Sequence, residues 1–199
     1  EHALGLYHVK GGLNQINHKM ALLIEKNGGK LHLNSPVEEI IVEKGVMKGL
    51  RVNGEFIAFD EVILNADVAY AMNHLIKPEH LRKYTPKKLK KKKYSVSTFM
   101  MYLGLDKEYD FSHHEILFSK DYESYLKGLT QNGFTDDISV YIHNPIRTDD
   151  TYAPKGHSSL FLLVPDPNLT AEVDWTPYRE HLEEVTLDLI QKRHNIDLR

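Results

Sequence analysis

The chain has 199 residues and a formal net charge of −3, and a chain of this size can bury a core without disulfides. Because it contains no cysteine, disulfides, thiolate metal sites and a cysteine nucleophile are excluded. Apolar residues make up 41% and charged residues 27% of it, which excludes extensive disorder, and its slight acidity gives no reason to expect nucleic acid binding.

The first predicted element is a helix over residues 13–27. Its apolar residues recur at intervals of three and four, the spacing of one helical face, at Leu13, Ile16, Met20, Leu23 and Ile24. Gly28-Gly29 follows and supplies the left-handed residue that commonly ends a helix. Beyond these glycines the period changes to two, which predicts a half-buried strand over residues 30–34.

A meander of short strands is predicted next, over residues 38–42, 46–52 and 55–64. Asn53-Gly54 between two of them is a strong hairpin signal, because both turn positions need a positive φ. The meander ends at Asn65-Ala66-Asp67, which is predicted to cap the helix that follows.

Residues 77–94 are predicted to form a connector. It contains a dense group of lysines, at Lys87, Lys88, Lys90, Lys91, Lys92 and Lys93. Such a run is typical of a solvated surface. A second interpretation is a patch that binds a membrane containing anionic lipid.

The second half of the chain is predicted to be an α+β unit. Strands are expected over residues 95–105, 115–118, 138–143 and 158–164, and helices around residues 122–129 and after Asp174. The strand at 95–105 is apolar on both sides, which predicts cover on both faces or one face that lines an apolar cavity.

The sequence motifs of common enzymes are missing. The chain has no G-x-G-x-x-G, P-loop, G-x-S-x-G or H-E-x-x-H. Its 12 histidines include one adjacent pair, His113-His114, but a strand points neighbours to opposite faces, so no metal site is predicted. Asp136-Asp137 and Asp149-Asp150 are predicted to begin turns. Gly11-Gly12 is predicted either to cap the first helix or to let the backbone approach a ligand closely.

Several segments together resemble a known family. The first half is similar to flavin-dependent desaturases and amine oxidases at residues 7–12, 29–37, 46–52 and 60–67. The second half resembles the bacterial phytoene desaturases and their dehydrosqualene relatives at residues 94–105, 113–118, 139–145, 148–149, 153–156 and 174–175. The His113-His114 pair and the Ala-Pro-x-Gly motif that begins at Ala153 are the most specific marks of this resemblance.

This resemblance implies a fold and a domain order. It implies an α+β chain in which part of a glutathione-reductase-like FAD-binding fold, a helix with a β-meander, precedes a mixed-sheet substrate domain. The corresponding boundaries are residues 1–76 for the FAD-binding part, 77–94 for the basic connector and 95–199 for part of the substrate domain. The family's G-x-G-x-x-G segment is not among these residues, so we expect an internal portion of a longer enzyme.

The resemblance also implies an activity, the introduction of C=C bonds into a long apolar polyene by an FAD-dependent carotenoid desaturase. It implies that FAD lies near Gly11, Gly12, Val37, Asn65, Ala66 and Asp67. The polyene is expected to lie against Phe99, Met101 and Leu103. The family's acidic catalytic group corresponds to a position before Glu1, so the catalytic residue stays unknown.

Two alternatives stay open. One is a related carotenoid oxygenase or saturase, and the other is a non-catalytic module whose apolar sheet face binds lipid or a partner protein. For the enzyme we expect a cytoplasmic location at the membrane periphery, with the lysines on anionic lipid. For the isolated chain we expect weak FAD binding, no catalysis, and self-association through the helix at 13–24 or the sheet face near Phe99.

Overall fold

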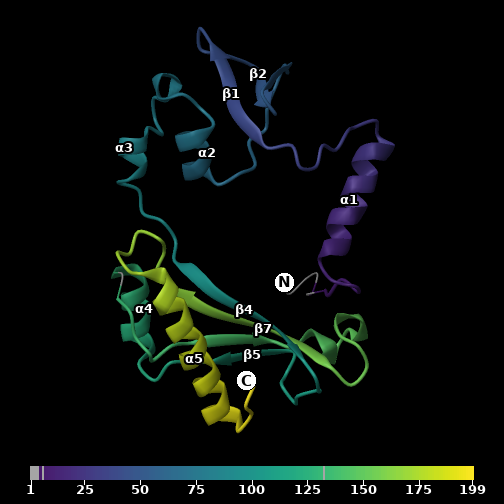
Figure 1. The fold of residues 1–199 in the computed structure, drawn as a ribbon, viewed down its shortest axis with the longest axis vertical. Coiled ribbons are helices and arrows are strands. Elements are labelled where there is room, and N and C mark those ends of the chain that lie inside the picture. Colours follow the sequence, from purple (N-terminus) through teal and green to yellow (C-terminus); the bar gives the residue numbers. More distant parts are fainter. Residues whose placement is uncertain (1–4, 6, 132) are drawn as a thin grey trace. The chain divides into compact units, whose positions relative to one another are not determined.

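The computed structural model describes residue 5, residues 7–131 and residues 133–199 and contains two compact units (Figure 1). One unit combines the segment that ends at Met20 with the segment that starts at Tyr94, and the other runs from Ala21 to Lys93. This grouping places Gly11 and Gly12 with the second half of the chain, whereas the predicted boundary at residue 76 places them with the first. Among the described residues, no helix has the length and apolarity needed to cross a membrane.

Helix α1 spans Asn14–Lys26, which confirms the helix predicted from the spacing of its apolar residues. It ends where the Gly29 amide donates to the Ile24 carbonyl over 3.0 Å, and Gly28 has the left-handed φ of +80° that this kind of helix end requires. No side chain of α1 is buried, so its apolar face is accessible.

The prediction of a strand over residues 30–34 is wrong. The segment leaves α1 irregularly and turns at Leu33-Asn34, where Asn34 has a left-handed φ of +53°. An apolar alternation becomes a strand only when a neighbour completes its backbone hydrogen bonds. Within the described part of the chain, no strand pairs with this segment.

A three-stranded sheet with the order β1-β2-β3 follows. Its antiparallel strands span Val37–Glu43, Val46–Val52 and Glu55–Ala58. Asn53 and Gly54 have φ values of +50° and +79°, which confirms the predicted hairpin. The third strand is shorter than predicted, because its pairing with β2 ends at the Gly49–Ala58 pair.

Helix α2 (Val68–His74) packs on this sheet. The Asp67 carboxylate accepts a hydrogen bond from the Tyr70 amide over 2.7 Å, which confirms the predicted cap. Ala71 lies in a small core with Ile40 of β1.

The connector contains two short helical turns, Pro78–His80 and α3 (Pro86–Leu89). Leu89 is buried, with 5% of its surface exposed, whereas the six lysines around it are all exposed. Within its unit, the run is thus a solvated surface anchored by one apolar side chain.

The second sheet is antiparallel and has the order β4-β7-β6-β5. Its strands span, in chain order, Ser97–Leu105, His114–Leu117, Val140–His143 and Ser158–Asp166. Helix α4 (Tyr122–Gln131) lies between β5 and β6 in the sequence, and the short turns Pro145–Arg147 and Asp150–Tyr152 precede β7. Helix α5 (Trp175–His194) begins at Asp174, whose carboxylate caps it. These elements confirm the predicted α+β unit.

One face of this sheet is the core of its unit. Figure 1 shows α5 crossing this face, and Leu182 and Ile190 of α5 belong to the same buried cluster as Met101 of β4 and Leu162 of β7. Leu162 and Ile190 have no exposed surface. Burial of apolar area in this cluster is therefore a large part of what holds this unit together.

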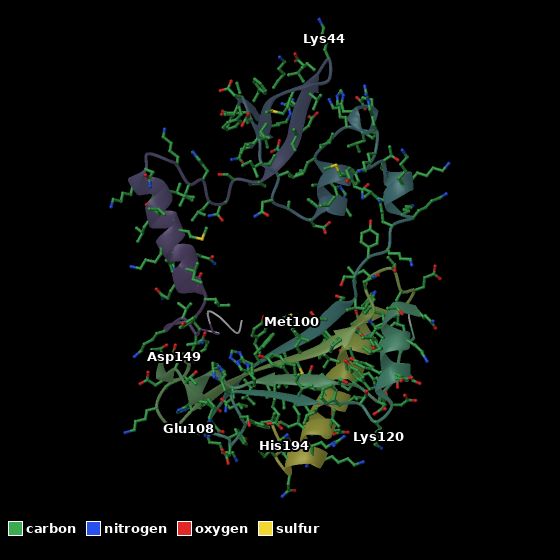
Figure 2. The ribbon with its side chains drawn as sticks, turned by 180° about the vertical axis from the view of Figure 1, so that it is seen from behind. Lys44, Met100, Glu108, Lys120, Asp149 and His194 are labelled. Atoms are coloured by element: carbon green, nitrogen blue, oxygen red, sulfur yellow. The ribbon has the colours of Figure 1, made fainter. Side chains whose placement is uncertain are left out.

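The opposite face, which we call the open face, is apolar and aromatic but much less buried. Tyr102 pairs with Phe161 and Met100 with Leu163 across β4 and β7, and Tyr102 and Met100 are 76% and 40% exposed. Figure 2 shows Met100 on the side of the sheet away from α5.

Candidate functional site

A groove of about 540 Å³ lies on the open face. Its lining residues are mostly apolar or aromatic: Leu13, Tyr102, Leu103, Gly104, His143, Pro145, Tyr152, Ser159, Leu160 and Phe161. Side chains that alternate along β4 and β7 reach it from the sheet, and Leu13 reaches it from the turn directly before α1. A concave, largely apolar surface with a few polar groups is the usual form of a small-molecule site.

The Gly11-Gly12 turn lies beside this groove, directly before Leu13. Gly11 and Gly12 have φ values of +82° and +90°, which side-chain-bearing residues rarely adopt. A Cβ atom on Gly12 would lie 3.0 Å from the Tyr152 hydroxyl oxygen. The turn therefore needs glycine both for its backbone conformation and for its packing.

Asp149 holds this turn in place. Its Oδ2 accepts hydrogen bonds from the Gly11 amide over 2.7 Å and from His8 Nε2 over 3.0 Å. Its Oδ1 accepts from the Thr151 amide and hydroxyl over 3.1 and 2.6 Å. The hydrogen bonds from Thr151, His8 and Gly11 hold the pKa of Asp149 well below its usual range, against the opposing effect of burial. Asp149 also caps a helical turn, as predicted, but its contact with Gly11 was not predicted.

Three histidines gather at the same end of the open face. His113 Nε2 lies 3.0 Å from His143 Nε2, and His113 Nδ1 lies 3.1 Å from the Thr148 hydroxyl. His114 Nδ1 lies 2.7 Å from the Tyr141 hydroxyl. The expectation that His113 and His114 point to opposite faces is wrong, because their rings stack with centroids 4.2 Å apart. His113 precedes β5, which begins at His114, so the alternation of a strand does not apply to it.

Two of these imidazoles, those of His143 and His113, have lowered pKa values. Burial, aided by the neighbouring His113 and His114, lowers the pKa of His143 to about 4. Burial also lowers the pKa of His113, with a smaller effect from His114 and His8. Neutral rings can accept protons or bind a metal ion.

The residues predicted to contact the polyene lie mainly on the core side of β4. Met101 is only 9% exposed and belongs to the buried cluster under α5, and Phe99 and Leu103 pack against that cluster. Leu103 also lines the groove. The large apolar side chains that β4 exposes are instead those of Met100 and Tyr102. This burial does not favour the substrate role predicted for Phe99 and Met101.

The residues predicted to bind FAD fall in both units. Gly11 and Gly12 belong to the unit that carries the groove, and Val37, Asn65, Ala66 and Asp67 belong to the other unit. Gly11, Asn65 and Ala66 are exposed, and Val37 at the start of β1 is half-buried. The Gly11 amide already donates to Asp149. The cofactor role of each residue stays a prediction.

Comparison with protein families matches residues 1–195 to the flavin-containing amine oxidoreductases. The chain belongs to this family. It is 49% identical over 195 residues to a 4,4'-diapophytoene desaturase of Methylomonas sp., covering 97% of this chain and 38% of that protein. It is 36% identical over 198 residues to an all-trans-zeta-carotene desaturase of Myxococcus xanthus, covering 96% and 37%. These relatives confirm the resemblance to carotenoid desaturases.

The chain also resembles a solved structure. An oxidoreductase from Methanosarcina mazei superposes with a TM-score of 0.65 at 18% identity, covering 92% of this chain and 39% of that one. At this identity the likeness shows the fold alone, and it agrees with the predicted α+β fold class. The chain spans less than two-fifths of the length of the two carotenoid desaturases compared above.

His8, Asp149 and His143 are site residues that were not assigned a role from the sequence. His143 ends the predicted strand at 138–143, and Asp149 stands in a predicted turn, so both had a local explanation. The strand register brings His143 next to His114, and hydrogen bonds bring Asp149 to His8 and Gly11. Both are long-range contacts that a local pattern does not reveal.

Proposed function

We propose that this chain is the substrate-facing part of an FAD-dependent carotenoid desaturase, which introduces C=C bonds into a long apolar polyene. The observation that carries the proposal is the apolar groove on the open face of the second sheet. The names of the Methylomonas and Myxococcus relatives, both carotenoid desaturases, support the same reaction class.

The groove suits a ligand without polar groups. Its described lining contains no Asp, Glu, Lys or Arg, so an apolar chain can bind there without removing a charge from water. Contact with Tyr102 and Phe161, whose rings lie 5.1 Å apart, removes apolar area of ligand and protein from water together.

FAD, when bound, supplies the acceptor for the hydrogen removed from the polyene. In the proposed enzyme this chain positions the polyene and excludes water from it. Asp149 holds the Gly11-Gly12 turn beside the groove, where glycine adds no side chain of its own between the backbone and a bound ring.

A chimera tests the reaction class. Replacing the matching segment of the Methylomonas desaturase with this chain is expected to give a flavin-containing enzyme that desaturates 4,4'-diapophytoene. The measurement is pigment analysis in cells that make this polyene. A folded, flavin-bound chimera that binds the polyene but leaves it unchanged would favour a non-catalytic binding module, and an oxygenated product would favour the oxygenase alternative.

A substitution at one exposed aromatic residue tests whether the polyene binds in the groove. In the chimera, Tyr102→Lys is expected to lower kcat/KM for the polyene about tenfold or more, because an ammonium group in an apolar groove must be desolvated when the substrate binds. Leu169→Lys is the matched control, since Leu169 is 80% exposed, similar to Tyr102 at 76%, and does not line the groove. Equal activity of the two variants would show that the polyene binds elsewhere.

The lysine run is proposed to hold the cytoplasmic enzyme at the surface of a membrane that contains anionic lipid and the polyene. All six lysines are exposed around the buried Leu89, and each basic residue near such a surface contributes about 1 kcal/mol. Changing Lys90–Lys93 to glutamine is therefore expected to weaken binding to anionic vesicles by more than tenfold at low salt, as measured by sedimentation. If vesicle binding changes neither with salt nor with these substitutions, the lysine run is a solvated surface only.

Two expectations for the isolated chain stay predictions. Weak FAD binding follows from the lack of a G-x-G-x-x-G segment within its 199 residues. Self-association follows from the exposed apolar side chains of α1 and of the open face.

A further inference from the structure

We propose that His113, His114 and His143 form a binding site for a transition-metal cation of the Zn²⁺ type. Each ring offers one nitrogen, and the three nitrogens all lie within 4.8 Å of one another. The inference rests on these three side chains and their neighbours and is independent of the proposed desaturase activity.

The backbone places the three rings together. His114 pairs directly with His143 across β5 and β6, and paired residues on one face of an antiparallel sheet have Cβ atoms about 5 Å apart. His113 joins them because its carbonyl accepts a hydrogen bond from the Asn144 amide over 2.9 Å, which holds the chain before β5 against the end of β6. Two strand ends therefore supply all three ligands.

Hydrogen bonds orient two of the rings for metal binding. The Thr148 hydroxyl contacts Nδ1 of His113 and the Tyr141 hydroxyl contacts Nδ1 of His114. Metal-binding histidines commonly hold their second nitrogen in this way, which leaves the other nitrogen for the ion. In the metal-bound form each Nδ1–H donates to its hydroxyl oxygen, and each Nε2 is free of a proton.

The spacing requires only a local adjustment. With Zn–N bonds of 2.0–2.1 Å, two nitrogens on a tetrahedral ion lie about 3.3 Å apart, close to the 3.0 Å between His113 Nε2 and His143 Nε2. The ion replaces the hydrogen bond between these two nitrogens. His114 is exposed, so its ring can shift together with the Tyr141 hydroxyl that it contacts and bring the third nitrogen within bonding distance.

The ligand set selects the class of ion. Three imidazoles suit Zn²⁺, Ni²⁺ or Cu²⁺, whereas Ca²⁺ and Mg²⁺ prefer oxygen ligands. Three protein ligands also leave a fourth position for water, as in zinc sites that act on a ligand rather than only stabilise a fold. Because His143 also lines the groove, this water would lie beside it.

Isothermal titration of the metal-free 199-residue chain with ZnCl₂ near neutral pH tests the site. We expect one Zn²⁺ per chain, no binding of Mg²⁺ at the same concentrations, and a loss of affinity of roughly tenfold or more in His114→Gln and in His143→Gln. His157→Gln is the matched control, because His157 is exposed and its Nδ1 contacts the Lys155 carbonyl two residues away. We expect this control to bind Zn²⁺ like the unchanged chain.

A second measurement separates lost ligation from lost folding. Zn²⁺ is expected to raise the thermal unfolding midpoint of the unchanged chain and of His157→Gln, but not that of His114→Gln, whose exposed ring contributes little to stability without metal. The proposal is overturned if the unchanged chain binds no Zn²⁺, or if the three variants bind Zn²⁺ with equal affinity.

Discussion

Leu162→Ala is expected to lower the free energy of unfolding of the groove-bearing unit by about 2–5 kcal/mol, the range for a large-to-small change in a packed core. Leu162 has no exposed surface and lies in the cluster beneath α5. Its neighbour Leu163 lies on the open face, where it pairs with Met100 of β4 and Tyr141 of β6. Leu163→Ala is expected to lower the free energy of unfolding by less than about 1 kcal/mol.

Urea denaturation of the two variants measures this difference. The pair is matched in residue type, strand and substitution, so only the face of the sheet differs. A larger loss for Leu163→Ala than for Leu162→Ala would contradict the placement of the core, and with it the placement of the groove on the other face.

Asp149→Ala is expected to release the Gly11-Gly12 turn from the second half of the chain. The carboxylate accepts four hydrogen bonds, from His8, the Gly11 amide, and the amide and hydroxyl of Thr151, and hydrogen bonds to a charged group are among the stronger ones. Its loss leaves the Gly11 amide without this partner. Hydrogen exchange of that amide is therefore expected to accelerate about a hundredfold.

Asp150→Ala is the matched control for this change, since Asp150 is the exposed neighbour of Asp149 and the substitution is expected to leave the hydrogen exchange of the Gly11 amide unaltered.

The contribution of Asp149 to the free energy of unfolding also depends on pH. Because hydrogen bonding lowers the pKa of Asp149 in the folded state, the unfolded state binds more protons, and this contribution is lost as the pH falls below about 4. Asp149→Asn is expected to show a shallower loss of stability over that range, and an unchanged slope would contradict the role of the charge.

Local elements of the fold were predicted from short stretches of sequence. Gly28-Gly29 ended α1, Asn53-Gly54 made the hairpin, and Asp174 capped α5, because the φ values and end hydrogen bonds of such elements depend on neighbouring residues. The strand predicted over residues 30–34 failed for the complementary reason. A strand depends on a partner that can lie anywhere in the chain, and alternation by itself does not supply one.

The sequence by itself also determined the family, since its motifs occur in order along the whole chain and the match to flavin-containing amine oxidoreductases covers residues 1–195.

Only the tertiary structure decided which face of β4 is the core. Both faces of that strand are apolar, so the choice depended on where α5 packs, and α5 lies more than 60 residues further along the chain. The tertiary structure also decided which residues form the site. Asp149 reaches Gly11 across 138 residues and His113 meets His143 across 30, and contacts of this kind arise from strand register and loop closure, which no local spacing encodes.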